Sequence, residues 1–201
     1  SEDFTQSPSA ISLDGIRNSW LDANIAFQKI SMFEIGRAQT LNYRNRLNVY
    51  PTNSQEIEGY ISANSWNLEL PSTIDAQGFP ALDYLLYGLG TDQELLEKFT
   101  TGPNASSYKM YLLDLVTVMQ NLTNEVFSDW SNGYRESYIT NINSSASGSV
   151  DQTVNAFLFY YEKALRAGKV GIPAGVFSGS PLPQNVESYY NQTISKLLNQ
   201  Q

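Results

Sequence analysis

The chain has 201 residues, of which 41% are hydrophobic and only 16% are charged, so it can bury a sizeable core and is not wholly disordered. Its 12 basic and 20 acidic residues give a net charge of −8, which argues against a nucleic-acid partner because phosphate binding needs a basic surface. The chain contains neither cysteine nor histidine, which excludes disulfides, Cys/His zinc sites, Ser-His-Asp triads and imidazole bases.

Two helices are predicted in the first third of the chain. Over residues 12–48, apolar side chains such as Trp20 and Phe27 recur at steps of three and four, which is typical of a helix with one buried stripe. Residues 54–63 repeat the pattern on a smaller scale, and Ile57 opens their stripe. The spacing therefore predicts one long helix followed by a short one.

The segment over residues 68–90 mixes Gly and Pro with a compact apolar run over residues 79–87. Nine residues between glycines suit a short helix, and Pro80 falls in its first turn, where a missing N–H costs nothing. Gly88 and Gly90 are expected to end this helix in a left-handed cap.

Helical patterns continue in the second half of the chain. One helix is predicted from residue 105 to at least residue 126, and a second over residues 150–167, after a Ser- and Asn-rich connector. The apolar face of this second helix carries Val154, Phe157, Tyr161 and Leu165. A last helix is predicted over residues 184–198. Because no strand pattern of useful length occurs, the sequence predicts an all-α protein built as an up-and-down helical bundle.

Residues 78–88, which read Gly-Phe-Pro-Ala-Leu-Asp-Tyr-Leu-Leu-Tyr-Gly, resemble the hallmark of the imelysin-like proteins, a family also labelled peptidase M75. That hallmark is Gly-x-His-x-x-Glu followed by Tyr-Leu-Leu, an aromatic residue and Gly. Weaker similarities follow in family order at residues 20–36, 47–52, 165–175 and 181–187, and the last two resemble imelysin-like lipoproteins of Bacteroidetes. The resemblance covers about residues 15–198.

The resemblance implies two packed helical bundles. The first would span residues 1–148 and carry the motif, and the second would begin with residues 149–201. Family members are usually longer than this chain, so the second bundle is expected to be incomplete here. A companion chain or a missing C-terminal segment would complete it, and without either an interface would be exposed.

The motif is degenerate in this chain. Gly78 matches the family, but Pro80 stands where the family has His and Asp83 stands where it has Glu. Helix residues three apart share a face, so a His and a Glu at this spacing can together hold a metal or activate a water. Pro80 offers no donor atom, and one carboxylate is not a zinc site. The metal chemistry implied by the family label therefore does not transfer to position 80, and enzyme activity is not expected.

Two charged residues interrupt the stripe of the first predicted helix. Glu34 and Arg37 occupy positions where apolar side chains are expected. In one interpretation they form an inward polar pair that binds a ligand opposite Asp83. In the other, the helical period drifts, Phe33 takes the core position and Glu34 moves to the flank. The sequence leaves both interpretations open.

The leading interpretation is an exported, imelysin-like binding protein, linked by its family to iron uptake and lacking peptidase activity. The expected ligand-binding residues are Asp83, Tyr84, Glu34 and Arg37, with Asp83 and Glu34 as metal ligands. The cofactor is not identified, but oxygen ligands favour hard cations such as iron or calcium. One alternative is a structural or polysaccharide-binding cell-surface protein that has lost the family site, and a metallopeptidase is the third.

The expected location is outside the cytoplasm, in the periplasm or as a lipoprotein of the outer membrane or cell surface. Abundant Asn, Ser, Thr, Gln and Tyr with few charges is a composition often found in exported proteins. The resemblance adds an outer-membrane anchor through a lipidated N-terminal segment that has been removed. The expected partner is a metal ion or a small ligand.

Overall fold

The computed structural model describes residues 1–143, 145 and 147–185. It is 71% helical, and within the described residues it contains no strand. The predicted all-α class is therefore confirmed. The helix predicted over residues 184–198 lies, beyond residue 185, outside the described part of the chain.

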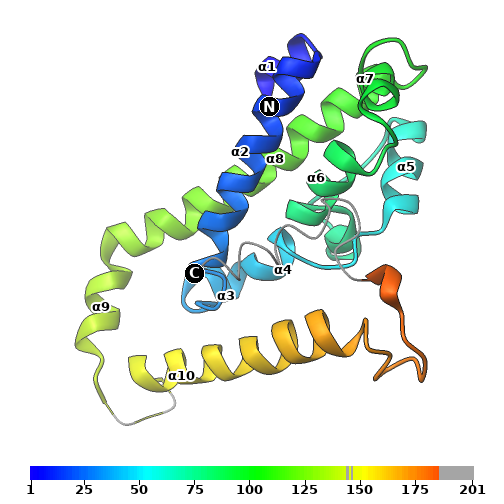
Figure 1. The fold of residues 1–201 in the computed structure, drawn as a ribbon. Coiled ribbons are helices and arrows are strands. Elements are labelled where there is room, and N and C mark those ends of the chain that lie inside the picture. The colour runs from blue at the N-terminus through cyan, green and yellow to red at the C-terminus, as the bar shows by residue number, and fades with distance from the viewer. Residues whose placement is uncertain (144, 146, 186–201) are drawn as a thin grey trace. The chain divides into compact units, whose positions relative to one another are not determined.

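Figure 1 labels the α-helices of the described residues, and the 3-10 and π-helical elements lie between or after them along the chain. They are α1 (Glu2–Gln6), α2 (Ala10–Gln28), α3 (Arg37–Leu41), α4 (Tyr43–Leu47), α5 (Ser54–Ala63), the 3-10 helix η1 (Pro71–Ala76), α6 (Gly78–Tyr87), α7 (Asp92–Thr100), α8 (Ala105–Asp129), η2 (Trp130–Tyr134), α9 (Arg135–Thr140), α10 (Ser149–Phe159), the π-helix η3 (Tyr160–Gly171) and the 3-10 turn η4 (Pro183–Asn185).

The chain divides into two compact units. Among the described residues, unit 1 comprises Ser1–Ala26 and Arg46–Met119, and unit 2 comprises Phe27–Asn45 and the described part of residues 120–185. The first part of α8 therefore belongs to unit 1 and its remainder to unit 2. The domain boundary that the sequence suggests after residue 148 stays a prediction.

The core of unit 1 is built from apolar side chains of α1, α2, α5, α6, α7 and α8. Phe4 of α1 and Phe99 of α7 meet edge to face, with their ring centroids 5.0 Å apart. Tyr111 of α8 is fully buried, and its hydroxyl donates a hydrogen bond of 2.6 Å to the carbonyl oxygen of Ala76. Each large apolar side chain that is fully buried contributes about 1.5–3 kcal/mol, so this core stabilises unit 1.

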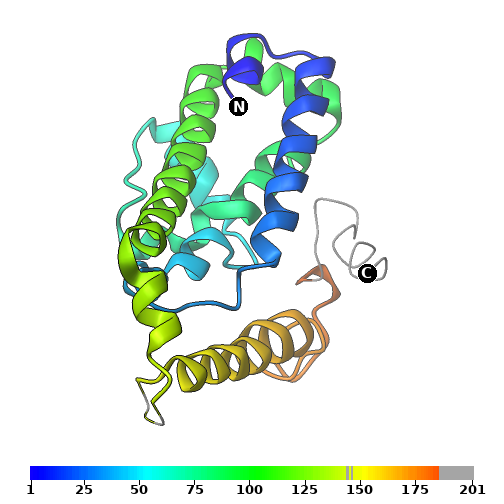
Figure 2. The same cartoon turned by 90° about the vertical axis from the view of Figure 1, so that its left-hand side faces the viewer.

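Helix α2 holds α6 near both of its ends (Figure 2). Near the start of α6, the indole N–H of Trp20 donates to the carbonyl oxygen of Phe79 at 3.1 Å. Near its end, the guanidinium of Arg17 donates to the carbonyl oxygen of Leu86 at 2.7 and 3.0 Å. The carbonyl groups in the last turn of a helix lack intrahelical donors. Arg17 supplies hydrogen-bond donors to one of these carbonyl groups in α6.

The single long helix predicted over residues 12–48 is wrong. Helix α2 ends at Gln28, and the chain then turns, with the N–H of Ile30 donating to the carbonyl oxygen of Phe27 three residues back. Gly36 precedes α3 with φ +59°, and Asn42 separates α3 from α4 with φ +52°. Such left-handed residues end a right-handed helix, and the apolar spacing gave no sign of them.

Helix α7 was not predicted, although its sequence carries a signal for it. Thr91 accepts a hydrogen bond from the backbone N–H of Glu94, and the Glu94 carboxylate accepts one from the N–H of Thr91, which is a capping box. Of the two glycines expected to form a left-handed cap after α6, Gly88 is right-handed with φ −92°, whereas Gly90 has the positive φ of +113°.

In unit 2, a kink at Asn132 and Gly133 separates α8 from α9. The helix predicted over residues 150–167 is present, but it passes from α10 into the π-helix η3 after Phe159. Its apolar face does not pack as a bundle helix would: Val154, Phe157, Tyr161 and Leu165 are between 45% and 51% exposed.

Candidate functional site

The degenerate motif lies in the core of unit 1. Every residue of α6 from Gly78 to Leu86 is buried. Pro80 is the third residue of this helix, where a backbone N–H has no intrahelical acceptor, so its predicted place in the first turn is confirmed. Asp83 lies one turn further along, with 8% of its surface exposed. The motif is therefore first of all a packing element of unit 1.

The backbone at the start of α6 requires a glycine at the motif position 78. Gly78 has φ +78°, a conformation that glycine alone adopts without strain. A Cβ atom placed on it would lie 2.3 Å from the carbonyl oxygen of Leu47, far inside the contact distance. Gly78 thus allows the start of α6 to pass close against the end of α4.

Tyr84, the residue after Asp83, belongs to a polar cluster at the edge of the core. Its hydroxyl donates to Oε1 of Glu58 at 2.7 Å, and the hydroxyl of Tyr108 donates to Oε2 of the same carboxylate at 2.6 Å. Lys98 Nζ donates in turn to the hydroxyl of Tyr108 at 3.0 Å. These four residues, here the Glu58 cluster, come from α5, α6, α7 and α8, and all lie in unit 1.

Tyr108 and Tyr60 keep their protons at neutral pH. Burial, together with the hydrogen bond and the negative charge of Glu58, raises the pKa of Tyr108 well above its ordinary value. A second phenol–carboxylate contact lies on α5, where the hydroxyl of Tyr60 donates to Glu56; this hydrogen bond is the main cause that raises the pKa of Tyr60 to about 12. Both carboxylates are thus held by neutral phenol donors.

A surface hollow of about 410 Å³ adjoins the Glu58 cluster through Lys98. It is lined by Leu89, Gly90, Glu94, Glu97, Lys98, Thr101 and Gly102. Lys98 belongs to both the hollow and the cluster, and it is half-buried. A ligand in the hollow would therefore meet the cluster through this ammonium group.

The charged residues predicted on the first helix lie in unit 2 and do not pair with each other. Glu34 accepts hydrogen bonds from the backbone N–H of Arg44, at 3.0 and 3.3 Å, and burial raises the pKa of its carboxyl group. Arg37 is exposed, and its guanidinium donates to Glu125. The apolar position that Phe33 was expected to take belongs to Ile35. A ligand-binding role for Glu34 and Arg37 stays a prediction.

The residues at the motif do not fit the metal that the family motif implies. Pro80 has no donor atom, and Asp83 supplies one carboxylate where a catalytic metal needs about three protein ligands. Throughout the described part of the chain, no three Asp or Glu side chains are grouped so that they could hold an ion. The assignment of Asp83 and Glu34 as metal ligands stays a prediction.

Sequence reasoning singled out Tyr84 but missed its partners Glu58, Lys98 and Tyr108. Tyr108 and Tyr111 of the same helix α8 are both buried and hydrogen-bonded within unit 1. The one local signal was a glutamate directly after Ile57 on a short amphipathic helix. No spacing rule connects that glutamate with residues 26 to 50 positions further on.

The fold and the cluster define an all-helical protein with a phenol–carboxylate site at the edge of its core. The chain belongs to the imelysin family: the family model described as Imelysin, of the peptidase M75 type, matches residues 1–197. This match confirms the resemblance seen in the motif. Comparisons with curated proteins and with solved structures give no match. Among the described helices, none combines the length and the apolar character needed to span a membrane.

Proposed function

We propose that this imelysin-family chain binds Fe(III), or a compound that presents Fe(III), as its cargo and does not cleave peptides. The observation that carries the proposal is the Glu58 cluster, in which two phenols donate to one carboxylate beside a surface hollow. The link of the family to iron uptake supports the choice of cargo.

The total negative charge that the cluster would carry with both phenols deprotonated favours a trivalent ion. Glu58 with the phenolates of Tyr84 and Tyr108 would carry a charge of −3, which neutralises Fe(III). Hard cations prefer oxygen ligands, and the two phenols and the carboxylate supply them. Calcium also binds oxygen but is the weaker candidate: either cation must displace the phenol protons, whose pKa is raised at least at Tyr108, and a divalent ion carries less charge than Fe(III) with which to do so. The positive charge of Lys98 would repel the cation, so the Lys98 side chain would have to turn away from the cluster into the hollow.

Titration of the purified chain with a weakly chelated Fe(III) salt tests this proposal. Binding through phenolate produces a visible charge-transfer absorption, and calcium in the parallel titration produces none. Tyr84→Phe and Tyr108→Phe should each abolish the absorption. Tyr161→Phe, which removes a half-exposed phenol of unit 2, is the matched control and should leave it unchanged. Absence of Fe(III) binding at micromolar concentration would refute the proposal.

The absence of peptidase activity rests on the donor atoms of the chain. A metallopeptidase activates a water on a metal held by about three protein ligands, and histidine commonly supplies them. This chain has no histidine, and position 80 is a proline. We therefore expect no cleavage of protein substrates. Cleavage that is inhibited by a chelator and lost in Asp83→Asn would restore the enzymatic interpretation.

We also propose that the chain works outside the cytoplasm, in the periplasm or as a lipoprotein at the outer membrane or cell surface. The family resemblance and the Asn-, Ser- and Tyr-rich composition support this location. Fractionation of the producing cells, with detection of the native protein by antibody, tests it. Recovery in the cytoplasmic fraction alone would contradict it.

The burial of α6 favours one second candidate, a structural or polysaccharide-binding surface protein on an imelysin scaffold. Because residues 78–86 are all buried, the motif helix serves as a core element whether or not a ligand binds nearby. In this case the Glu58 cluster only joins helices. The chain should then bind cell-surface polysaccharide and not Fe(III). Polysaccharide binding should be unchanged in three variants, Glu34→Gln, Tyr84→Phe and Asp83→Asn.

A further inference from the structure

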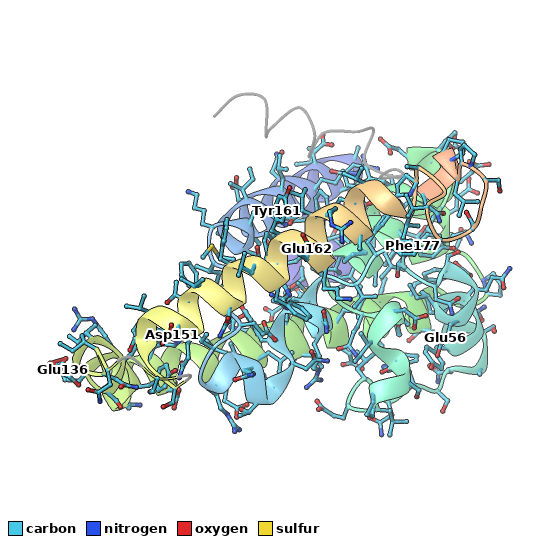
Figure 3. The ribbon with its side chains drawn as sticks, turned by 90° about the horizontal axis from the view of Figure 1, so that it is seen from below. Glu56, Glu136, Asp151, Tyr161, Glu162 and Phe177 are labelled. Carbon is cyan, nitrogen blue, oxygen red and sulfur yellow. The ribbon has the colours of Figure 1, made fainter. Side chains whose placement is uncertain are left out.

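The sequence contains a single asparagine followed by glycine, the pair Asn132 and Gly133. The pair lies in η2, at the kink that separates α8 from α9. Figure 3 labels Glu136 on α9, the short helix that begins two residues after Gly133. An asparagine in front of a glycine can react with the backbone of its own chain, because no side chain shields the nitrogen that follows it.

In this reaction the backbone nitrogen of Gly133 attacks the Cγ atom of Asn132. A bond forms between these two atoms, the Cγ–Nδ2 bond breaks, and the side-chain nitrogen leaves as ammonia with the proton of the backbone N–H. The product is a five-membered succinimide ring. Water then opens the ring at either of its two carbonyl groups, which yields aspartate or isoaspartate. Water is the only co-reactant.

The backbone at this pair has already left the helical conformation. Ring closure requires the nitrogen of the next residue to approach Cγ, and a regular helix holds that nitrogen away. Asn132 has φ −101° and ψ 24°, and Gly133 has φ 128°, so neither residue is helical. Both residues are exposed, and a Cβ placed on Gly133 would meet nothing within 4 Å. The kink therefore leaves room for the rotation that the reaction needs.

Three asparagines of unit 1 that precede a serine are held more firmly. Asn18 lies inside α2, where helical hydrogen bonds fix the backbone. The side-chain oxygen of Asn53 accepts a hydrogen bond of 3.2 Å from the N–H of Glu56. That of Asn64 accepts one of 3.0 Å from the hydroxyl of Ser107. Sequence and local structure thus both single out residue 132.

We propose that Asn132 loses its side-chain amide in the folded chain, without an enzyme, and becomes a mixture of aspartate and isoaspartate. The modification adds a negative charge at the kink. Isoaspartate also lengthens the main chain by a carbon atom, because the chain then runs through the side chain of residue 132. The site is independent of the Glu58 cluster, which lies in the other unit.

The lengthened main chain would fall within a group of packed aromatic rings in unit 2. Trp130 meets Tyr134 and Tyr138 edge to face, with ring centroids 5.0 and 5.3 Å apart. The ring of Tyr134 also packs on Gly36, where an added Cβ would lie 2.6 Å from it. Residue 132 lies between Trp130 and Tyr134 in the chain, so isoaspartate changes the spacing of these rings. Aspartate has the shape of asparagine and preserves it.

Peptide mass spectrometry of the full chain after incubation in mildly alkaline buffer tests the proposal. The peptide that contains Asn132 should gain the mass of an amide-to-acid conversion at least about 10-fold faster than the peptide that contains Asn18, which is exposed but helical. Isoaspartyl methyltransferase should label the first peptide. Asn132→Gln should remove both signals, because its longer side chain would have to close a six-membered ring.

The same measurement in unfolding concentrations of urea separates the effect of the kink from that of the sequence. The rate at Asn132 should rise less than about 10-fold on unfolding, because the kink already gives the backbone freedom, whereas the rate at Asn18 should rise more. The proposal is overturned if residue 132 keeps its amide in the folded chain and reacts only in urea. It is also overturned if Asn18 reacts as fast as Asn132 in the folded chain.

Tryptophan fluorescence tests the consequence for packing. Asn132→Asp supplies the aspartate form alone, and chromatography separates the isoaspartate form from the incubated chain. The emission of Asn132→Asp should match that of the parent, and the emission of the isoaspartate form should differ from both. The difference should come from Trp130, because Trp20 and Trp66 lie in unit 1. Equal emission of the aspartate and isoaspartate forms would overturn the predicted change in ring spacing.

Discussion

Replacement of Gly78 by alanine tests whether the motif glycine is required by the backbone. The residue has φ +78°, and its missing side chain leaves room for the carbonyl oxygen of Leu47, which would lie 2.3 Å from a Cβ. The carbonyl oxygen belongs to the backbone of Leu47, so it cannot move aside as the end of a flexible side chain would. Gly78→Ala is therefore expected to destabilise unit 1 strongly.

The size of the effect follows from two costs. A non-glycine residue in a left-handed conformation costs roughly 1–2 kcal/mol. Forcing an extra methyl group into a packed site costs roughly 1–3 kcal/mol more. The expected loss is about 3 kcal/mol, a large share of the 5–15 kcal/mol that typically stabilises a domain.

Tryptophan fluorescence during urea unfolding measures this loss in unit 1 alone. In a Trp130→Phe background, the remaining tryptophans are Trp20 and Trp66, both in unit 1. Gly59→Ala is the control, because Gly59 lies on α5 with nothing within 4 Å of a Cβ, and it should gain about 0.5–1 kcal/mol. A Gly78→Ala variant within 1 kcal/mol of the parent would refute the reasoning.

Three further substitutions test other contacts. Tyr111→Phe should cost about 1–3 kcal/mol in urea unfolding, because it leaves the buried carbonyl oxygen of Ala76 without this donor; an unchanged midpoint would contradict the assignment. Thr91→Ala should cost about 1 kcal/mol through the lost cap of α7, and Glu97→Ala on the same helix serves as control. Burial raises the pKa of the Glu34 carboxyl group from 4.5 in the folded state. The contribution of this group to folding stability is therefore present at low pH and is lost as the pH rises through the raised pKa of the folded state. Glu34→Gln should be at least as stable as the parent at pH 7, and the difference should shrink towards pH 4.5. An NMR titration that places this pKa below 4.5 would contradict that sign.

The sequence predicted those helices whose signals are local. Helix α5 covers the predicted residues 54–63, although Asn53 and not Ser54 caps it, and α6 begins at Gly78 and ends before Gly88. The stretch over residues 29–36 was not predicted, because its chain reversal depends on turn hydrogen bonds and a left-handed Gly36, which apolar spacing does not encode. The capping box of Thr91 and Glu94 shows that α7 was predictable from local signals.

The candidate site was harder to predict because it is assembled from distant parts of the chain. The Glu58 cluster joins four helices, and its partners are separated by 10 to 50 residues. A single sequence indicates which residues can bind a cation but not which of them meet. Helical spacing likewise marks the apolar face of the helix over residues 150–167 without showing whether anything covers that face.

The structure separates the scaffold role of the motif from the proposed ligand role, and one pair of variants can show the separation. Gly78 acts on the backbone inside unit 1, whereas Tyr84 presents its hydroxyl to Glu58, a half-buried carboxylate that water can also reach. Tyr84→Phe should therefore cost less than about 1 kcal/mol of stability while it removes Fe(III) binding. Gly78→Ala should reverse this pattern, lowering stability while the folded fraction still binds Fe(III). If both variants lose stability and binding in parallel, the loss of binding only reports unfolding, and the Glu58 cluster is a contact between helices.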